Sequence, residues 1–132
     1  MNVGRAAAQA SHASNAFIHS HGKEKGAKTW QNSTTQGFGT AIILSASSEQ
    51  IRRILLSAHS KRLPASWVWD PEYGMPVTKE IYELMPQKVN VCPPIYKEDG
   101  TVVFFRSVDT CAYIFGKKSE LVEILGELPL FP

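Results

Sequence analysis

The segment RAAAQASHASNAFIHS, which spans Arg5–Ser20, predicts a helix near the start of the chain. It contains six alanines, and alanine has the highest intrinsic helix propensity of all residues. Ala6, Ala10, Ala13 and Phe17 follow one another at helical spacing and therefore form one apolar stripe. Because three of these four side chains are small, we expect the helix to lie close against its neighbour.

A second, mostly polar stripe runs along the same predicted helix. It lies roughly 100° around the helix from the apolar stripe, given the helical period. We therefore expect it to face a cleft or solvent at the edge of the core. Its members are Arg5, Gln9, His12, Ala16 and His19.

The chain beyond this helix alternates between loop, strand and helix patterns. Residues 21–39 are rich in Gly, Ser, Thr, Asn and Lys, so we expect mostly loop, with Trp30 as its anchor. The apolar run Thr40–Ser45 predicts a strand that is buried on both faces. Ser47–Gln50 matches a capping box, which predicts a second amphipathic helix ending near Lys61.

The next part of the chain predicts a strand and a less regular segment. Ala65–Trp69 has a strand pattern, and we expect Asp70 and Pro71 to stop it. Residues 77–85 predict a short helix, and residues 89–92 a strand within an otherwise irregular stretch.

A hairpin is the clearest prediction in the C-terminal part. Asp99-Gly100 is a strong turn signal between the apolar segments 95–97 and 101–106. A last strand over Thr110–Phe115 precedes a helix that Ser119 can cap. Taken in order, these elements predict a single three-layer α/β domain over residues 1–132, with helices flanking a mixed, roughly four-stranded sheet.

Composition and charge exclude several functional classes. The net charge of +2 permits a local basic patch but does not indicate a nucleic-acid partner. Cys92 and Cys111 lack metal-ligand spacing, which predicts a reduced, cytoplasmic compartment and leaves a single disulfide open. His19 and His21 have no carboxylates or cysteines clustered near them, so we expect no metal site. No apolar run approaches the roughly 18 residues that span a bilayer, and no signal peptide is apparent.

The N-terminal sequence MNVGRAAAQASHAS resembles the type-2 peptidyl-tRNA hydrolase family. In that family a Met, two variable residues, a Gly and a Lys or Arg precede an Ala-rich helix that contains Gln and His-Ala. Later features follow in the family's order, more loosely after Asp70. The matching positions are Met1, Gly4, Arg5, Gln9, His12, Ala13, Trp30, Gln36, Gly37, Asp70 and the strand Thr110–Phe115 with Gly116.

The resemblance implies a cytoplasmic α/β esterase and a homodimer. Such an enzyme hydrolyses the ester between a peptide, or an N-blocked aminoacyl group, and tRNA without a metal or cofactor. Three features depart from the family: its first apolar strand and following Lys would precede Met1, its Asp-Ala-Gly turn is replaced by Asp70–Gly74, and residues 77–106 form an insertion. These departures support an alternative, a non-catalytic tRNA- or RNA-binding relative of the same fold.

Four residues are candidates for ester hydrolysis, which needs an activated water, a stabilised oxyanion and a positioned leaving group. The resemblance and its predicted place at a strand end favour Asp70 for orienting water, although an Asp before Pro71 can also start a turn. His12 can act as a base near neutral pH or bond at a packing seam. Gln9 can donate to the ester carbonyl or to the terminal adenosine. Thr110 can hold water or substrate, or serve only as a β-branched strand residue.

Four basic residues are candidates for binding the phosphates of the substrate. Arg5 follows Gly4 at the predicted helix N-terminus, which is itself favourable for anions, although an exposed cation there is an equally good interpretation. Lys23, Lys25 and Lys28 lie in the predicted loop and can meet tRNA phosphates, or they can form a solvated lysine-rich loop.

Overall fold

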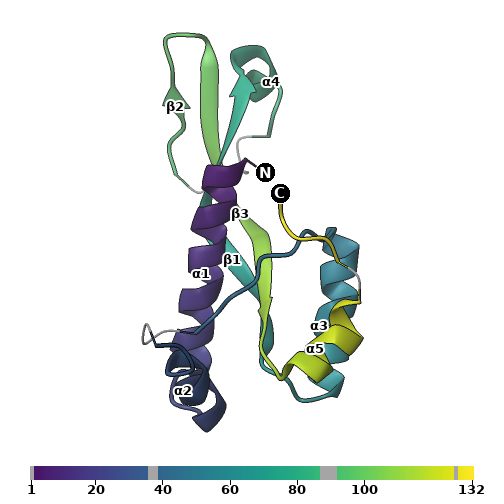
Figure 1. The fold of residues 1–132 in the computed structure, drawn as a ribbon. Helices are drawn as coiled ribbons and strands as arrows, with labels where there is room; N and C mark the ends of the chain where they lie inside the picture. The colour runs from purple at the N-terminus through teal and green to yellow at the C-terminus, as the bar shows by residue number, and fades with distance from the viewer. Residues whose placement is uncertain (1, 36–38, 87–91, 127) are drawn as a thin grey trace. The chain divides into compact units, whose positions relative to one another are not determined.

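The computed structural model describes residues 2–35, 39–86, 92–126 and 128–132. The chain divides into two compact units: unit 1 is Met1–Val68 with Cys111–Pro132, and unit 2 is Trp69–Thr110. Strands β1 (Ala65–Thr78) and β3 (Thr101–Ile114), seen in Figure 1, each contribute residues to both units. The single domain expected over residues 1–132 stays a prediction.

The helix predicted from the alanine-rich segment is confirmed as α1 (Val3–His21). Asn2 caps it, because its side-chain oxygen accepts a hydrogen bond from the backbone N–H of Arg5 at 2.9 Å. The small-residue stripe is the packing face, as expected: Ala6 and Phe17 are buried, and the two alanines between them are half-buried.

The prediction of mostly loop over residues 21–39 is wrong at its centre, where α2 (Lys25–Gln31) forms. Tertiary packing stabilises this short helix, which its own propensity would not hold together. Ala27 is fully buried, and the Trp30 ring lies 5.6 Å from the ring of Phe17 and 6.1 Å from that of Phe115. Trp30 therefore anchors the segment, as predicted.

Gly39 lies against the Trp30 indole, so we expect Gly39→Ala to destabilise the protein. A Cβ at Gly39 would lie 2.1 Å from the ring, and the ring is held in place because its Nε1–H donates to the carbonyl oxygen of Thr40 at 2.8 Å. Overpacking of this kind costs roughly 1–3 kcal/mol, measurable by urea denaturation. Gly4→Ala is the control, since its nearest neighbour would be 3.8 Å away. Equal stabilities of the two variants would contradict the expectation.

The prediction of a buried strand over Thr40–Ser45 is wrong. Leu44 forms an isolated bridge with Leu130, and the rest of the segment has no strand structure. Ile42 and Ile43 are 71% and 46% exposed. Within the part of the chain that the structure describes, residues 129–131 are the backbone partners of this segment, so its other edge lacks the neighbouring strand that burial requires.

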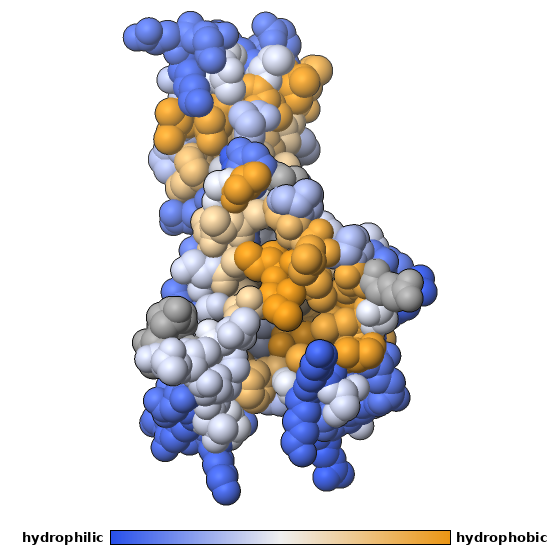
Figure 2. All heavy atoms as spheres, in the orientation of Figure 1, coloured by the Kyte–Doolittle hydropathy of each residue, from blue (hydrophilic) through white to orange (hydrophobic). Residues whose placement is uncertain are grey.

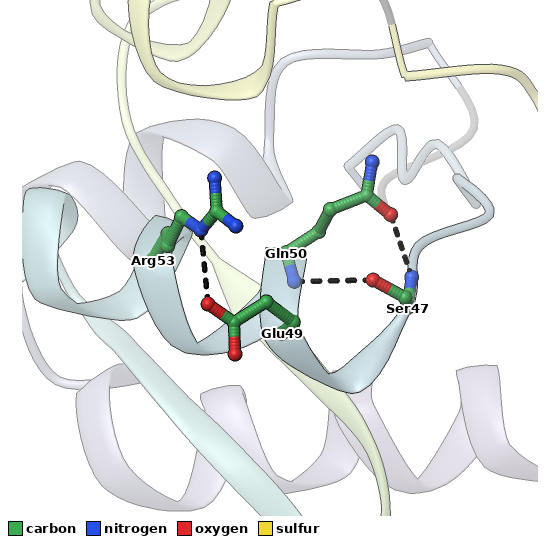
Figure 3. A network of polar contacts seen from close by, with 4 residues as sticks. All are labelled: Ser47, Glu49, Gln50 and Arg53. Atoms are coloured by element: carbon green, nitrogen blue, oxygen red, sulfur yellow. Dashed lines mark hydrogen bonds and ion pairs between the residues drawn. The ribbon is translucent and has the colours of Figure 1, made fainter.

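The predicted capping box is confirmed at the start of α3 (Ser48–Ser60) and is drawn in Figure 3. The Ser47 hydroxyl accepts from the backbone N–H of Gln50 at 3.2 Å, and the Gln50 side chain accepts from the backbone N–H of Ser47 at 2.8 Å. Glu49 and Arg53 pair at 3.1 Å on the exposed side of the helix. The helix therefore begins where the sequence predicts.

The core of unit 1 lies between α3, α5 (Lys118–Leu125) and the strands. In Figure 1, α3 and α5 lie side by side. Successive residues of β3 point to opposite faces, so Ile114 joins this core while Tyr113 contacts Phe17 of α1. The core consists of Leu55, Ala58 and Ala65, with Ile51, Leu63, Trp67, Ala112, Ile114 and Ile124 packed against it.

The predicted cap of the last helix is wrong. α5 begins at Lys118, so the cap residue is Lys117 and not Ser119. Glu120 decides this start, because its carboxylate accepts a hydrogen bond from the backbone N–H of Lys117 at 2.8 Å.

The two long strands continue through positions where we expected breaks. β1 was expected to cover Ala65–Trp69 and to stop at Asp70-Pro71, but it runs on to Thr78. The break is absent because β1 is the edge strand in the order β1-β3-β2, where the missing N–H of a proline can face away from the ladder. The strands predicted over residues 101–106 and 110–115 likewise join into β3.

The predicted hairpin is confirmed in unit 2. β2 (Ile95–Tyr96) pairs antiparallel with residues 102 and 103 of β3. Gly100 at the turn has a φ of 80°, which glycine adopts without a steric penalty. The backbone N–H of Thr101 donates to the Asp99 carboxylate at 2.9 Å, which lowers the pKa of that carboxyl.

The helix predicted over residues 77–85 is present with shorter bounds, as α4 (Lys79–Glu83). The Thr78 hydroxyl caps it by accepting from the backbone N–H of Ile81 at 3.4 Å. Of the strand predicted at 89–92, only Cys92 lies within the described residues, and it forms a bend.

The described residues therefore form an α/β structure with a three-stranded antiparallel sheet. In unit 2 the Tyr82 ring of α4 lies 6.3 Å from Phe104 of β3 and 6.1 Å from Tyr96 of β2. Four strands and three complete layers stay predictions.

Candidate functional site

The structure brings together the three lysines that we predicted to bind phosphate. Lys23, Lys25 and Lys28 line one shallow hollow of about 630 Å³ in unit 1. We call this surface the lysine hollow. In Figure 2 hydrophilic side chains gather at the end of unit 1 where Figure 1 shows α2. The remaining lining residues are Thr29, Asn32 and Ser33.

The positive charge of the lysine hollow is not neutralised locally. Glu24 is the only acidic residue in the sequence between positions 21 and 35, and its carboxylate contacts His21 Nδ1 at 2.7 Å. Among the residues that the structure describes, none of the three lysines forms an ion pair with a carboxylate. A concave surface with several uncompensated cations attracts polyanions such as nucleic-acid backbones.

The polar side chains between the lysines bond to backbone carbonyls of the same segment. The Thr29 hydroxyl donates to the carbonyl oxygen of Lys25 at 2.9 Å, and the Ser33 hydroxyl donates to that of Trp30 at 2.7 Å. Because these hydroxyl protons are already used, the lysine ammonium groups are the charged donors that can meet a phosphate, together with the second amide proton of Asn32, whose first donates to the carbonyl oxygen of Lys28 at 2.9 Å.

His21 connects the lysine hollow to the rest of unit 1. Its ring stacks on Phe17 with a centroid distance of 5.7 Å and meets Tyr113 edge-on at 6.1 Å. Together with its contact to Glu24, this fixes the start of α2 against α1 and β3. This role was not predicted from the sequence, in which His21 has only the features of a weak metal ligand.

Gln9 and His12 lie on different sides of α1. Gln9 is only 5% exposed, and its backbone carbonyl accepts a hydrogen bond from the Cys111 thiol at 3.4 Å. His12 is exposed, as expected. The expectation that the whole second stripe faces a cleft or solvent is therefore wrong for Gln9. Gln9 is three residues after Ala6 and four before Ala13, which places it on the packing face.

Asp70 and Thr110 are half-buried residues of unit 2. Asp70 lies inside β1 and not at its carboxyl end, and its side chain accepts from the backbone N–H of Glu72 at 3.1 Å. Thr110 lies in a strand, as predicted. Since Gln9 and His12 belong to unit 1, the joint catalytic role of these four residues stays a prediction.

Arg5 is half-buried in the first turn of α1. Its backbone N–H already donates to the Asn2 side chain at 2.9 Å, so that group of the helix N-terminus is not open to a phosphate. Any phosphate contact of Arg5 would therefore come from its guanidinium group.

Metal-binding clusters, disulfides and membrane-spanning helices are not found in the described ranges. No cluster of three or more His, Cys, Asp or Glu side chains there is arranged to hold a metal ion. Cys92 and Cys111 are not joined in a disulfide, so the bond that the sequence left open is not formed. No helix in these ranges has the length and apolar character to cross a membrane.

No protein-family model matches the chain, and no curated protein or solved structure matches it. The resemblance to type-2 peptidyl-tRNA hydrolases therefore rests on the N-terminal motif and the order of later features.

Proposed function

We propose that the chain is a peptidyl-tRNA hydrolase, an esterase that recycles tRNA in the cytoplasm without a metal or cofactor. The lysine hollow carries this proposal, because three lysines without carboxylate partners among the described residues surround one concave surface. The hollow belongs to the same unit as the motif Gly4–Ala13, whose resemblance supports a peptidyl ester as the substrate.

In the proposed reaction, water attacks the ester carbonyl carbon and the ribose oxygen leaves with a proton. Asp70 orients the water or accepts its proton, and Thr110 holds the water or the substrate backbone. Where Asp70 only orients the water, His12 is the base that takes the proton, and the base returns that proton to the leaving ribose oxygen. Gln9 donates to the ester carbonyl or to the terminal adenosine, which requires the packing around its buried side chain to open.

We also infer that the complete fold is a four-stranded, three-layer domain that forms a homodimer. The exposed apolar residues Ile42 and Ile43 support an interface with a second copy of the chain, since such side chains are normally covered.

Hydrolysis of N-acetyl-aminoacyl-tRNA by the purified chain tests the proposed function. We expect release of free tRNA, whereas unblocked aminoacyl-tRNA stays largely intact. Acid-gel electrophoresis of the tRNA after the reaction separates the two forms. If no free tRNA is released at high protein concentration, the hydrolase proposal is wrong.

The Asp70→Asn variant tests the proposed mechanism more directly than the activity assay alone. Asparagine keeps an oxygen that can accept the hydrogen bond from the Glu72 N–H, so we expect the variant to fold. Loss of the carboxylate should lower turnover by on the order of 10²-fold or more, the usual size of a general-base contribution. Asp109→Asn, at an exposed position of β3, is the matched control. A folded Asp70→Asn with normal turnover removes Asp70 from the mechanism.

A non-catalytic tRNA- or RNA-binding protein is the second candidate. The burial of Gln9 favours it, because a buried amide does not touch substrate. This candidate predicts that tRNA binds to the lysine hollow with no ester cleavage, so the same assay together with a binding measurement distinguishes the two functions.

A further inference from the structure

A second group of basic side chains lies where α3 ends and α5 begins, in unit 1. Lys61 and Arg62 follow α3, while Lys117 and Lys118 lie at the start of α5. All four are exposed. We call these four residues the junction cluster.

Backbone and side-chain contacts hold the two halves of the junction cluster together. The backbone N–H of Phe115 donates to the carbonyl oxygen of Pro64 at 2.8 Å. A Cβ at Gly116 would lie 3.3 Å from the Leu63 side chain. Lys61 and Arg62 come just before β1, and Lys117 and Lys118 come just after β3. The two segments that carry the four cations therefore adjoin neighbouring ends of these strands.

Phe115 also connects the junction cluster to the lysine hollow. Its ring lies 6.1 Å from that of Trp30 in α2, and a Cβ at Gly26 would meet it at 3.4 Å. In Figure 1, α2, the end of α3 and the start of α5 lie at the same end of unit 1. Figure 2 shows two groups of hydrophilic side chains at that end, with less polar surface between them.

Most of the charge in the junction cluster has no carboxylate partner. Lys61 pairs with Glu123. Within the described part of the chain, no ion pair involves Arg62, Lys117 or Lys118. The nearby Glu120 carboxylate accepts from a backbone N–H, at 2.8 Å.

Arg62 has a backbone conformation that is unusual for its residue type. Its φ of 56° is the only positive φ of a non-glycine residue within the described ranges. Glycine is favoured at such positions after a helix, and another residue type costs on the order of 1 kcal/mol. Glycine is therefore the substitution at position 62 that this backbone conformation accepts best.

We infer that the junction cluster and the lysine hollow form one phosphate-binding surface, and that tRNA lies across it. This inference rests on the proposed function for the identity of the polyanion. Two separated groups of cations suit a long polyanion that contacts both, because each phosphate contact releases counterions and adds to the affinity.

The triple variant Arg62→Gly, Lys117→Gln and Lys118→Gln tests the inference. Glycine suits the backbone at position 62, so we expect the midpoint of thermal unfolding to stay equal or to rise. The affinity for deacylated tRNA, measured by fluorescence anisotropy, should fall roughly 10- to 100-fold at 0.1 M salt. The slope of log affinity against log salt should become shallower by roughly 2–3.

A charge-matched control distinguishes the effect of a local binding surface on tRNA affinity from the effect of net charge. Arg52→Gln, Arg53→Gln and Lys79→Gln also remove three positive charges, at positions early in α3 and in α4. We expect this control to retain more of the affinity than the junction variant. Equal losses in the two variants would overturn the inference.

The remaining outcomes distinguish this inference from the proposed function. If tRNA binds and the junction variant loses that binding, but no ester is cleaved, the hydrolase proposal fails and the shared surface stands. If ester cleavage occurs while the junction variant binds tRNA normally, the shared surface fails alone. Absence of tRNA binding by the unaltered chain, or a preference for anionic vesicles over tRNA, overturns the inference.

Discussion

Charge reversal of Lys23, Lys25 and Lys28 to glutamate is expected to weaken tRNA binding by at least about 100-fold at 0.1 M salt. The three side chains line one hollow, and the local acid Glu24 is engaged by His21 at 2.7 Å. Three new carboxylates would therefore leave this surface with no lysine or arginine between positions 21 and 35. Titration of labelled tRNA at several salt concentrations measures the effect.

The salt dependence and a matched control decide whether this effect is local. The difference between the variant and the unaltered chain should shrink towards 1 M salt, because the Debye length falls from about 10 Å at 0.1 M to about 3 Å. Arg52→Glu, Arg53→Glu and Lys79→Glu make the same change in net charge elsewhere. An equal loss of affinity in that control would show that net charge alone attracts tRNA.

Phe17→Ala is expected to cause the largest loss of stability, roughly 3–5 kcal/mol. Phe17 is only 4% exposed, and its ring joins α1 to α2 and to the end of β3. Alanine would leave a cavity that these elements cannot fill without moving. The ring partners that would lose contact are His21, Trp30, Tyr113 and Phe115.

Urea denaturation followed by circular dichroism measures this loss. A change of this size is a large part of the 5–15 kcal/mol that usually stabilises a domain, so partial unfolding at room temperature is an expected result. Ile18→Ala, at the next and 38% exposed position of α1, should cost much less. Equal losses in the two variants would contradict the assigned role of Phe17. Because Phe17 holds α2 in place, its replacement should also weaken tRNA binding.

Elements with local signals were predicted well. α1 follows from its alanines, the start of α3 from the reciprocal Ser47–Gln50 bonds, and the hairpin turn from Asp99 and Gly100. In each case the deciding contacts join residues a few positions apart, so a short window of sequence contains the necessary information.

Elements that depend on distant partners were predicted poorly. α2 forms because Trp30 packs against rings of α1 and the end of β3, which no local propensity indicates. β1 passes through Pro71 because it is an edge strand, and the order of strands is not readable from its own residues. Thr40–Ser45 has a buried-strand composition but lacks a strand partner among the described residues.

The same distinction between local signals and distant partners applies to the candidate site. The sequence by itself determined which residue types are present: a lysine-rich segment after an alanine-rich helix, with Gln9, His12, Asp70 and Thr110 as candidates for chemistry. Only the tertiary structure decided that the lysines share one hollow, that Gln9 is buried against β3, and that a second basic cluster meets α2 through Phe115. The physical reason is that charge and propensity belong to single residues, whereas burial and convergence arise when segments far apart in the chain pack together.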